Sequence, residues 1–133
     1  LDRRQSLPIL GHVLLKIESS QLAIVGTDSE IELVAFASLT TQNDNIAVTL
    51  PGKKLFDICK VLPEGSEIKF VLNKQLMQLS SGRSRFSLQT LAVTDFPSLE
   101  NLPAQVELAL PQSQFRAILE QSLFAVALQD VRY

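Results

Sequence analysis

Residues 46–62 read IAVTLPGKKLFDICKVL, and they join a strand pattern to a helix pattern. Its first part, Ile46–Leu50, is a β-rich run typical of a strand. Pro51 suits the first position of a helix, where its missing N–H costs nothing. The apolar residues behind it recur at i, i+3, i+4 and i+7, which is one helix face: Leu55, Ile58, Cys59 and Leu62. The stretch therefore predicts a strand that leads directly into an amphipathic helix, which Pro63 and Gly65 end.

Short strands are predicted on both sides of this unit. The last of them alternates strictly, with Phe86 and Leu88 on one side and Arg83 and Arg85 on the other. The six predicted strands are His12–Ile17, Gln21–Gly26, Glu30–Ser38, Glu67–Asn73, Gln75–Ser80 and Arg83–Leu91. Antiparallel strands combined with one or more helices predict an α+β fold.

The strand–proline–helix unit recurs 60 residues later. Val106–Leu110 is strand-like, Pro111 follows, and a helical apolar stripe continues as far as Ala127. Two matches fit either a duplicated architecture or coincidence, because proline is common at helix starts. Ala92–Ala104 contains two prolines and is predicted to be a linker. We expect one domain over residues 1–103 and the start of a second over 104–133, whose helix has no sheet to cover it, as in a piece of a longer protein.

Composition limits the class of protein. The chain has 133 residues, with 12 Lys+Arg against 14 Asp+Glu and a formal net charge of −2. This balance excludes a protein that coats nucleic acid with a generally basic surface, but it is compatible with a local basic patch. No apolar run approaches the roughly 18 residues that span a bilayer, and the N-terminus has no signal-like apolar region. The single cysteine excludes an internal disulfide, so we expect a reducing, cytoplasmic location without membrane contact.

Catalytic and metal-binding groups are scarce. The only histidine, His12, is expected to be structural, and Cys59 is expected to be a buried, inert thiol. Asp28 and Glu30 admit a metal or an acid–base pair, but a turn whose side chains bind the local backbone is favoured. One histidine and one cysteine cannot make an ordinary zinc site, and the glycines form no phosphate loop. We therefore expect no catalytic residue, no metal and no cofactor.

Paired basic residues are the remaining chemical signal. Lys53 and Lys54 fall in the first turn of the predicted helix, where cations oppose the helix dipole. Their position favours an anionic partner over a merely solvated helix face. Arg83 and Arg85 share one strand face, which fits a solvated face, a protected edge or an edge that pairs with an acidic partner.

Seven short strings occur in order along the whole chain, and together they are highly specific: LPILG at 7–11, GTDSE at 26–30, FDIC at 56–59, LPEG at 62–65, SGRSRFSL at 81–88, DFP at 95–97 and QDVRY at 129–133. With these strings the chain closely resembles the β subunit of bacterial DNA polymerase III, the replicative sliding clamp. The resemblance implies a non-catalytic processivity factor that encircles duplex DNA without reading its sequence, slides along it and tethers the polymerase.

The resemblance also implies an architecture. In that family three similar domains form a subunit, and two subunits close head to tail into a ring. Helices line the central hole, and antiparallel sheets form the outer rim. This chain would then be most of the N-terminal domain without its first strand and helix, followed by the first strand and helix of the middle domain. The implied partners of the intact protein are double-stranded DNA, a second copy of the subunit, the polymerase catalytic subunit and the clamp loader.

Individual roles are implied by matching positions. The positions that match DNA-facing residues are Arg4, Lys53, Gln129 and Tyr133. Arg132 matches the edge of the pocket that receives partner peptides. The first-domain face of the subunit interface is matched by Lys54, Ile58, Leu62, Arg83, Arg85, Phe86 and Leu88. Where the family often has arginine this chain has Lys53, which keeps the charge and lacks the bidentate geometry.

Two other classes of function remain open from the residues alone. One is a stand-alone protein-interaction module that binds a partner strand along the edge at 83–91. The other is an α+β enzyme whose further catalytic residues lie outside this sequence. Two more copies of the strand–helix pattern in flanking sequence would favour the clamp, and a segment rich in histidine and aspartate would favour the enzyme.

Overall fold

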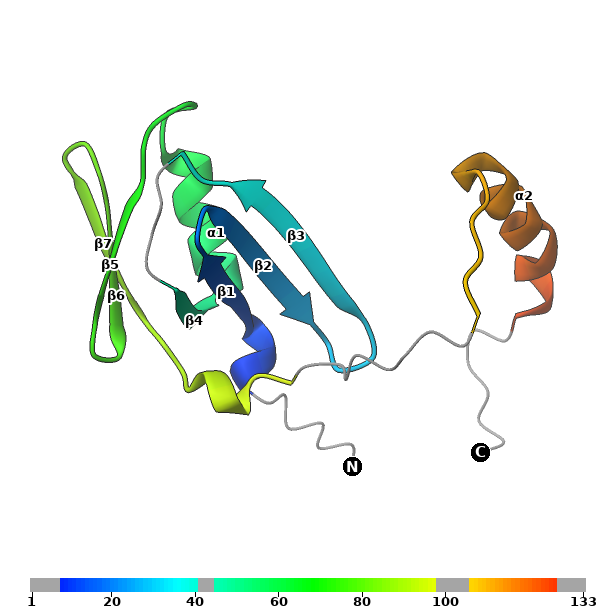
Figure 1. The fold of residues 1–133 in the computed structure, drawn as a ribbon, viewed down its shortest axis with the longest axis horizontal. Coiled ribbons are helices and arrows are strands. Elements are labelled where there is room, and N and C mark those ends of the chain that lie inside the picture. The colour runs from blue at the N-terminus through cyan, green and yellow to red at the C-terminus, as the bar shows by residue number, and fades with distance from the viewer. Residues whose placement is uncertain (1–7, 41–44, 98–105, 127–133) are drawn as a thin grey trace. The chain divides into compact units, whose positions relative to one another are not determined.

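The computed structural model describes residues 8–40, 45–97 and 106–126. The chain divides into two compact units, Leu1–Glu100 and Asn101–Tyr133, and each is treated by itself. Figure 1 shows the first unit as two antiparallel sheets with one helix, and the second as a single helix with its leading segment.

The first sheet has the strand order β3-β2-β1-β4. After a short 3₁₀ turn, η1 (Pro8–Gly11), come β1 (His12–Glu18), β2 (Gln21–Thr27), β3 (Glu32–Ser38) and β4 (Ile46–Pro51). All neighbouring strands are antiparallel, and β4 returns to pair with β1, Leu15 opposite Val48. This non-sequential pairing brings the segment that precedes the helix into the sheet.

The second sheet is a meander of three strands in the order β5-β6-β7. They are β5 (Lys69–Asn73), β6 (Leu76–Ser81) and β7 (Ser84–Gln89). The hairpins at 18–21, 73–76 and 81–84 each have two loop residues, and the first of the two has a positive φ: Ser19, Lys74 and Gly82. This geometry matches the twist of the flanking strands. The three strands predicted here are confirmed, with ends that differ from the predicted ones by one or two residues.

One hydrophobic core joins both sheets and α1 (Gly52–Val61). Figure 1 shows α1 lying against one face of the first sheet, with β5–β7 beside it. The buried residues of this cluster are Leu15, Val48 and Leu50 from the first sheet, Leu55 from α1, and Met77, Leu79 and Leu88 from the second sheet. The helix predicted after Pro51 is thus confirmed, and its apolar face positions it against the sheets.

The opposite face of the first sheet has its own smaller core. It consists of Ile9, Leu14, Val25 and Phe96. The hydroxyl of buried Thr49 donates to the Leu91 carbonyl oxygen at 2.8 Å and accepts from the Leu91 N–H at 2.9 Å. A 3₁₀ turn, η2 (Val93–Asp95), follows, and the next residue, Phe96, packs in this core. The linker predicted to begin at Ala92 was therefore placed too early, because periodicity cannot show that Phe96 packs against a distant sheet.

The second unit contains α2 (Gln112–Ser122) and the 3₁₀ turn η3 (Leu123–Ala125). The helix predicted after Pro111 is confirmed, with a shorter α-helical part. The strand predicted at Val106–Leu110 is not formed among the described residues, where these positions carry no strand hydrogen bonds. A β-strand exists only through hydrogen bonds to a neighbouring strand, and the described part of this unit offers none. Across the described ranges no helix is long and apolar enough to cross a membrane.

Candidate functional site

The N-terminus of α1 carries the first candidate residues. Pro51 precedes the helix without a side-chain cap, and Gly52 lies so close to β1 that a Cβ there would stand 3.1 Å from Val13 Cγ1. Lys53 and Lys54 follow in the first helical turn, and both are exposed. The positive end of the helix dipole and two ammonium groups thus share one small region, which favours anions.

Lys53 is held by an ion pair on the same helix. Its Nζ lies 2.9 Å from Asp57 Oδ2, one helical turn further on. The Lys53 side chain is 87% exposed and that of Asp57 is 54% exposed. An exposed pair of this kind stabilises a helix by only about 0.3–0.5 kcal/mol. The lysine therefore remains accessible to solvent anions while its carboxylate partner neutralises part of its charge.

The apolar stripe of α1 is only partly buried. Leu55 is in the core, Ile58 packs at its border, and Leu62 is half-buried just beyond the helix. Cys59 is exposed, so the prediction of a buried thiol was wrong. Successive helical residues are turned by about 100°, and the sheets cover the side that carries Ile58 while Cys59 falls on the adjacent open side.

Strand β7 is an edge strand of the second sheet. Among the described strands it pairs only with β6. The alternation predicted for it is confirmed: Leu88 is buried and Phe86 half-buried on the core side, while Arg85 is exposed on the outer side. Arg83 lies in the hairpin turn between β6 and β7 and is exposed. Along its outer edge, β7 therefore has backbone N–H and C=O groups that no described strand pairs with. The cations of Arg83 and Arg85 lie near this edge.

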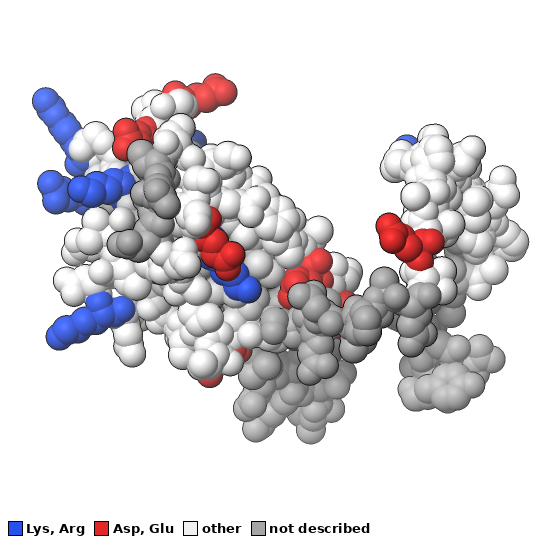
Figure 2. Space-filling view, viewed as in Figure 1, with Lys and Arg blue, Asp and Glu red and all other residues white. Residues whose placement is uncertain are grey.

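Basic side chains gather over this sheet. Figure 2 shows Lys and Arg side chains projecting at the left of the first unit, where β5–β7 lie. The outer face carries Lys69 and Arg85 in one cross-strand row with Ser80 between them. The outer face of the second sheet is therefore locally positive, although the net charge of the chain is −2.

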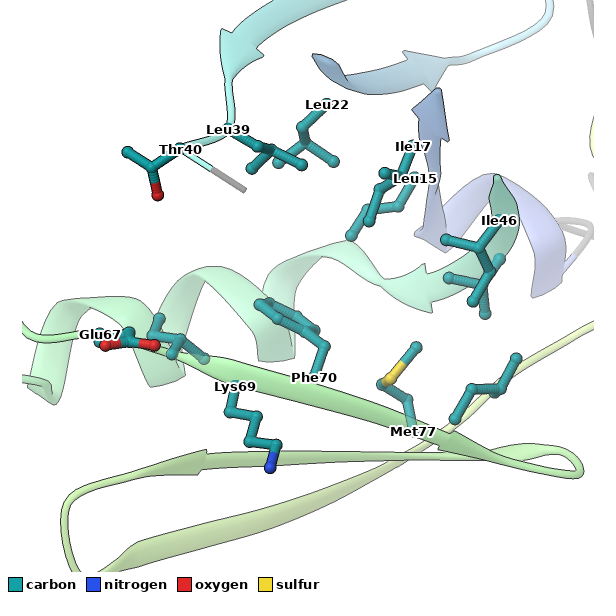
Figure 3. A pocket seen from close by; sticks show the side chains of 13 residues that line it. Leu15, Ile17, Leu22, Leu39, Thr40, Ile46, Glu67, Lys69, Phe70 and Met77 are labelled. Carbon is teal, nitrogen blue, oxygen red and sulfur yellow. The ribbon is translucent and has the colours of Figure 1, made fainter. Parts of the chain in front are cut away.

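An apolar hollow of about 580 Å³ lies between the two sheets. Figure 3 shows Phe70 and Met77 of the second sheet pointing toward the side that holds Leu15, Ile17 and Leu22 of the first. Glu67 and Lys69 lie at its border. Strand β5 beside it is exposed along its whole length. Among the described residues that line it, no polar groups converge on the hollow, so its chemistry suits packing of apolar side chains.

Asp28 has a structural role, as predicted. Its carboxylate accepts hydrogen bonds from the Glu30 and Ile31 N–H groups at 2.9 and 2.7 Å, and Thr27 Oγ1 accepts from the Ser29 N–H. The bonds from Ile31 and then Glu30 lower the pKa of Asp28, because they favour the ionised form. Over residues 8–40, 45–97 and 106–126 no group of three or more His, Cys, Asp or Glu side chains could hold a metal.

His12 provides a pH-dependent test of the fold. Burial lowers the pKa of His12 below 6.5, and the nearby Thr49 backbone opposes this shift only in part. Its Nδ1 is buried without a hydrogen-bond partner in the described structure. Because the folded state favours the neutral ring, the stability it contributes is complete above pH 6.5 and is lost as the pH falls through the lowered folded pKa.

We expect the free energy of unfolding to fall between about pH 7 and pH 5, and His12→Asn to remove part of that dependence. Denaturant titrations of both proteins across this range measure the difference. A parallel pH profile for the two proteins would contradict this account of His12.

Four predicted site residues lie outside the described residues: Arg4, Gln129, Arg132 and Tyr133. The structure does bring Lys53, Lys54 and Ile58 together on α1, and Arg83, Arg85, Phe86 and Leu88 together at β7. Asp57 is a further residue of this site, and its position four residues after Lys53 is the sequence signal for the ion pair.

Comparisons with known proteins identify one family. The family model described as DNA polymerase III beta subunit, N-terminal domain, matches residues 1–100. The beta sliding clamp of Escherichia coli K12 is 46% identical over 133 residues, which is all of this chain and 36% of that protein. That of Pseudomonas putida is 43% identical over the same length. The chain thus spans about a third of the length of these curated relatives.

Solved structures agree with the sequence comparisons. The crystal structure of the DNA polymerase III subunit beta from Pseudomonas aeruginosa superposes with a TM-score of 0.91 at 41% identity, over 96% of this chain and 35% of that chain. Caulobacter crescentus pol III beta has a TM-score of 0.85 at 26% identity, over 99% and 35%. A P. aeruginosa sliding clamp bound to griselimycin has a TM-score of 0.86 at 42% identity, over 99% and 36%.

Proposed function

Because this chain belongs to the DNA polymerase III β subunit family, we propose that it forms part of a ring-shaped processivity factor of the bacterial replicative DNA polymerase. The observation that carries the proposal is the similarity to sliding clamps along all 133 residues. In this role the protein is a non-catalytic subunit of the polymerase holoenzyme, acts in the cytoplasm and needs no cofactor.

We propose residues 1–103 as an N-terminal clamp domain without its first strand and helix, and 104–133 as the start of the middle domain. Strands β5, β6 and β7 repeat the meander of β1, β2 and β3, and β4 adds a fourth strand to the first sheet only. Among the described strands β5 pairs only with β6, and this open edge with the apolar hollow beside it supports a further strand and helix there. Val106–Leu110 would then become a strand through pairing within the complete middle domain.

The proposed mechanism is topological. A closed ring cannot leave duplex DNA sideways, so weak contacts with phosphates are sufficient and permit sliding. Lys53 supplies one such contact, and its 87% exposed side chain at a positive helix end supports this role. Arg4, Gln129 and Tyr133 are proposed to approach the same duplex. Such contacts carry no sequence information, which suits a protein that must move along any DNA.

The proposed subunit interface consists of α1 and β7. Strand β7 offers a free edge for pairing with a second copy, Phe86 offers a half-buried ring, and Arg83 and Arg85 offer charges to acidic residues of the partner. Lys54, Ile58 and Leu62 extend this face along α1. Leu88 is buried within its own domain, and we propose that its packing in the core holds β7 in place for the interface. Arg132 is proposed to border the pocket that binds peptides of the polymerase catalytic subunit and the clamp loader.

A second candidate function is a protein-interaction module that captures a partner strand along β7. The free edge of β7 favours it, since an edge strand offers backbone hydrogen bonds to any extended peptide. The two candidates differ in their use of DNA. Only the clamp requires Lys53 and Arg4 to contact phosphate.

Replacing Arg4 or Lys53 by alanine in the full-length ring tests the DNA contact. We expect each variant to stay folded, to be retained less well on DNA, and to lose about 0.9 from the slope of log affinity against log salt for each phosphate contact removed. Retention of loaded rings on end-blocked DNA at several salt concentrations measures this slope. If both variants load normally and keep the parent salt dependence, the DNA role of these residues is wrong.

A further inference from the structure

We infer that Asp57 is a positioning residue that weakens the contact between Lys53 and DNA phosphate, so that the proposed ring slides freely. The inference rests on the proposed DNA-binding role of Lys53. It assigns a function to an acidic residue on the surface that is proposed to face DNA.

The geometry of the pair carries the inference. Lys53 Nζ donates to Asp57 Oδ2 at 2.9 Å. An ammonium group has three donors, so this bond engages one and leaves two for a phosphate. The lysine side chain is 87% exposed, and the pair lies on the surface and not in the core. A phosphate that reaches Lys53 therefore also approaches the Asp57 carboxylate.

Helix stability does not explain the order of the two residues. A helix gains more from an acidic residue at its N-terminal end and a basic residue one turn later, because this order suits the dipole. In α1 the order is reversed, with Lys53 in the first turn and Asp57 behind it. Lys53 thus lies where its charge can bind an anionic partner. Asp57 lies where its negative charge weakens the attraction between Lys53 and that anion.

The size of the effect follows from simple electrostatics. The ion pair competes with phosphate for the ammonium group, and the carboxylate repels the phosphate at a separation of several ångströms in water. Surface interactions of this strength change an equilibrium constant about two- to fivefold at each site. A change of that size leaves DNA bound but alters the rate of sliding, since each step along the duplex breaks and remakes these contacts.

The test measures diffusion of labelled full-length rings along stretched duplex DNA. Asp57→Asn keeps the size of the side chain and removes its charge, so we expect the diffusion coefficient to fall two- to fivefold at about 0.1 M salt. Lys53→Ala should raise it. The double variant should behave as Lys53→Ala alone, because Asp57 acts through Lys53. Loss of helix stability alone would not produce this dependence on Lys53.

Glu64→Gln is the matched control. It removes the same charge from an exposed residue beyond the far end of α1, a helix about 15 Å long. This separation exceeds the Debye length of about 10 Å at 0.1 M salt, so Glu64→Gln should slide as the parent does. Equal slowing by both neutralisations would mean that net charge, and not the pair, controls sliding, and would overturn the inference.

The remaining outcomes separate the two proposals. If Lys53→Ala speeds sliding while Asp57→Asn leaves it unchanged or faster, the role of Asp57 is wrong and the DNA contact of Lys53 stands. Slowing by Asp57→Asn in the Lys53→Ala background would show that Asp57 acts through another group. If Lys53→Ala has no effect on sliding, the DNA contact of Lys53 and the inference built on it both fail.

Discussion

Replacing Phe86 by glutamate is expected to dissociate the proposed two-subunit ring. Phe86 is half-buried on the edge strand β7 and packs at the border of the main core. Pairing with a second subunit would bury the rest of the ring, so glutamate would place an unpaired carboxylate in an apolar contact. Such a charge costs about 3–5 kcal/mol, which raises the dissociation constant at least about 100-fold. The closed ring has two such junctions, so the cost is incurred twice.

Sedimentation and light scattering of the full-length protein measure the loss of the dimer. Because Phe86 also touches its own core, Arg85→Glu serves as a second variant. Arg85 is exposed, so reversing its charge tests the same edge without disturbing packing. Gln78→Glu adds the same charge on the central strand β6, away from the edge, and should leave the dimer intact. An unaltered dimer in both Phe86→Glu and Arg85→Glu would exclude β7 from the interface.

Replacing Leu50 by alanine is expected to destabilise the first unit most strongly. Leu50 is completely buried, in the cluster that joins the two sheets and α1. Removing a buried leucine side chain costs about 2–5 kcal/mol, because the transfer free energy is lost and a cavity remains. Leu50 also stands immediately before the turn into α1, so the change should loosen the support of Lys53.

Denaturant unfolding followed by circular dichroism measures this effect. Leu33→Ala removes the same atoms from a side chain that is 74% exposed on β3, and it should change stability by less than about 0.5 kcal/mol. Equal losses for the two variants would mean that Leu50 is not part of a tightly packed core. A stable Leu50→Ala protein would contradict the shared core of α1 and the two sheets.

Local patterns in the sequence predicted most elements and their faces. Pro51 and the stripe behind it predicted α1, and the alternation at 83–91 predicted the two faces of β7. Asp28 was correctly assigned to a turn, because short polar side chains bind the backbone within a few residues. The ordered strings identified the family, which the comparisons then confirmed. The roles proposed for individual site residues remain predictions.

Contacts between distant residues accounted for the errors. Phe96 was assigned to a linker although it closes the smaller core, and Cys59 was assigned to the interior although the sheets leave it uncovered. Val106–Leu110 has the composition of a strand and forms none here, because strand formation depends on a neighbour. In each case the missing information was which other segment lies alongside.

Local sequence patterns were sufficient to place most strands and helices, to assign most of their apolar sides, and to identify the sliding-clamp family, because periodicity, turn chemistry and ordered strings are local properties. The folded arrangement was needed to show that β4 pairs with β1, that β7 is an edge strand, and that Phe96 closes the smaller core. These features arise from pairing and packing between segments far apart in the chain, whose free energy no local pattern records.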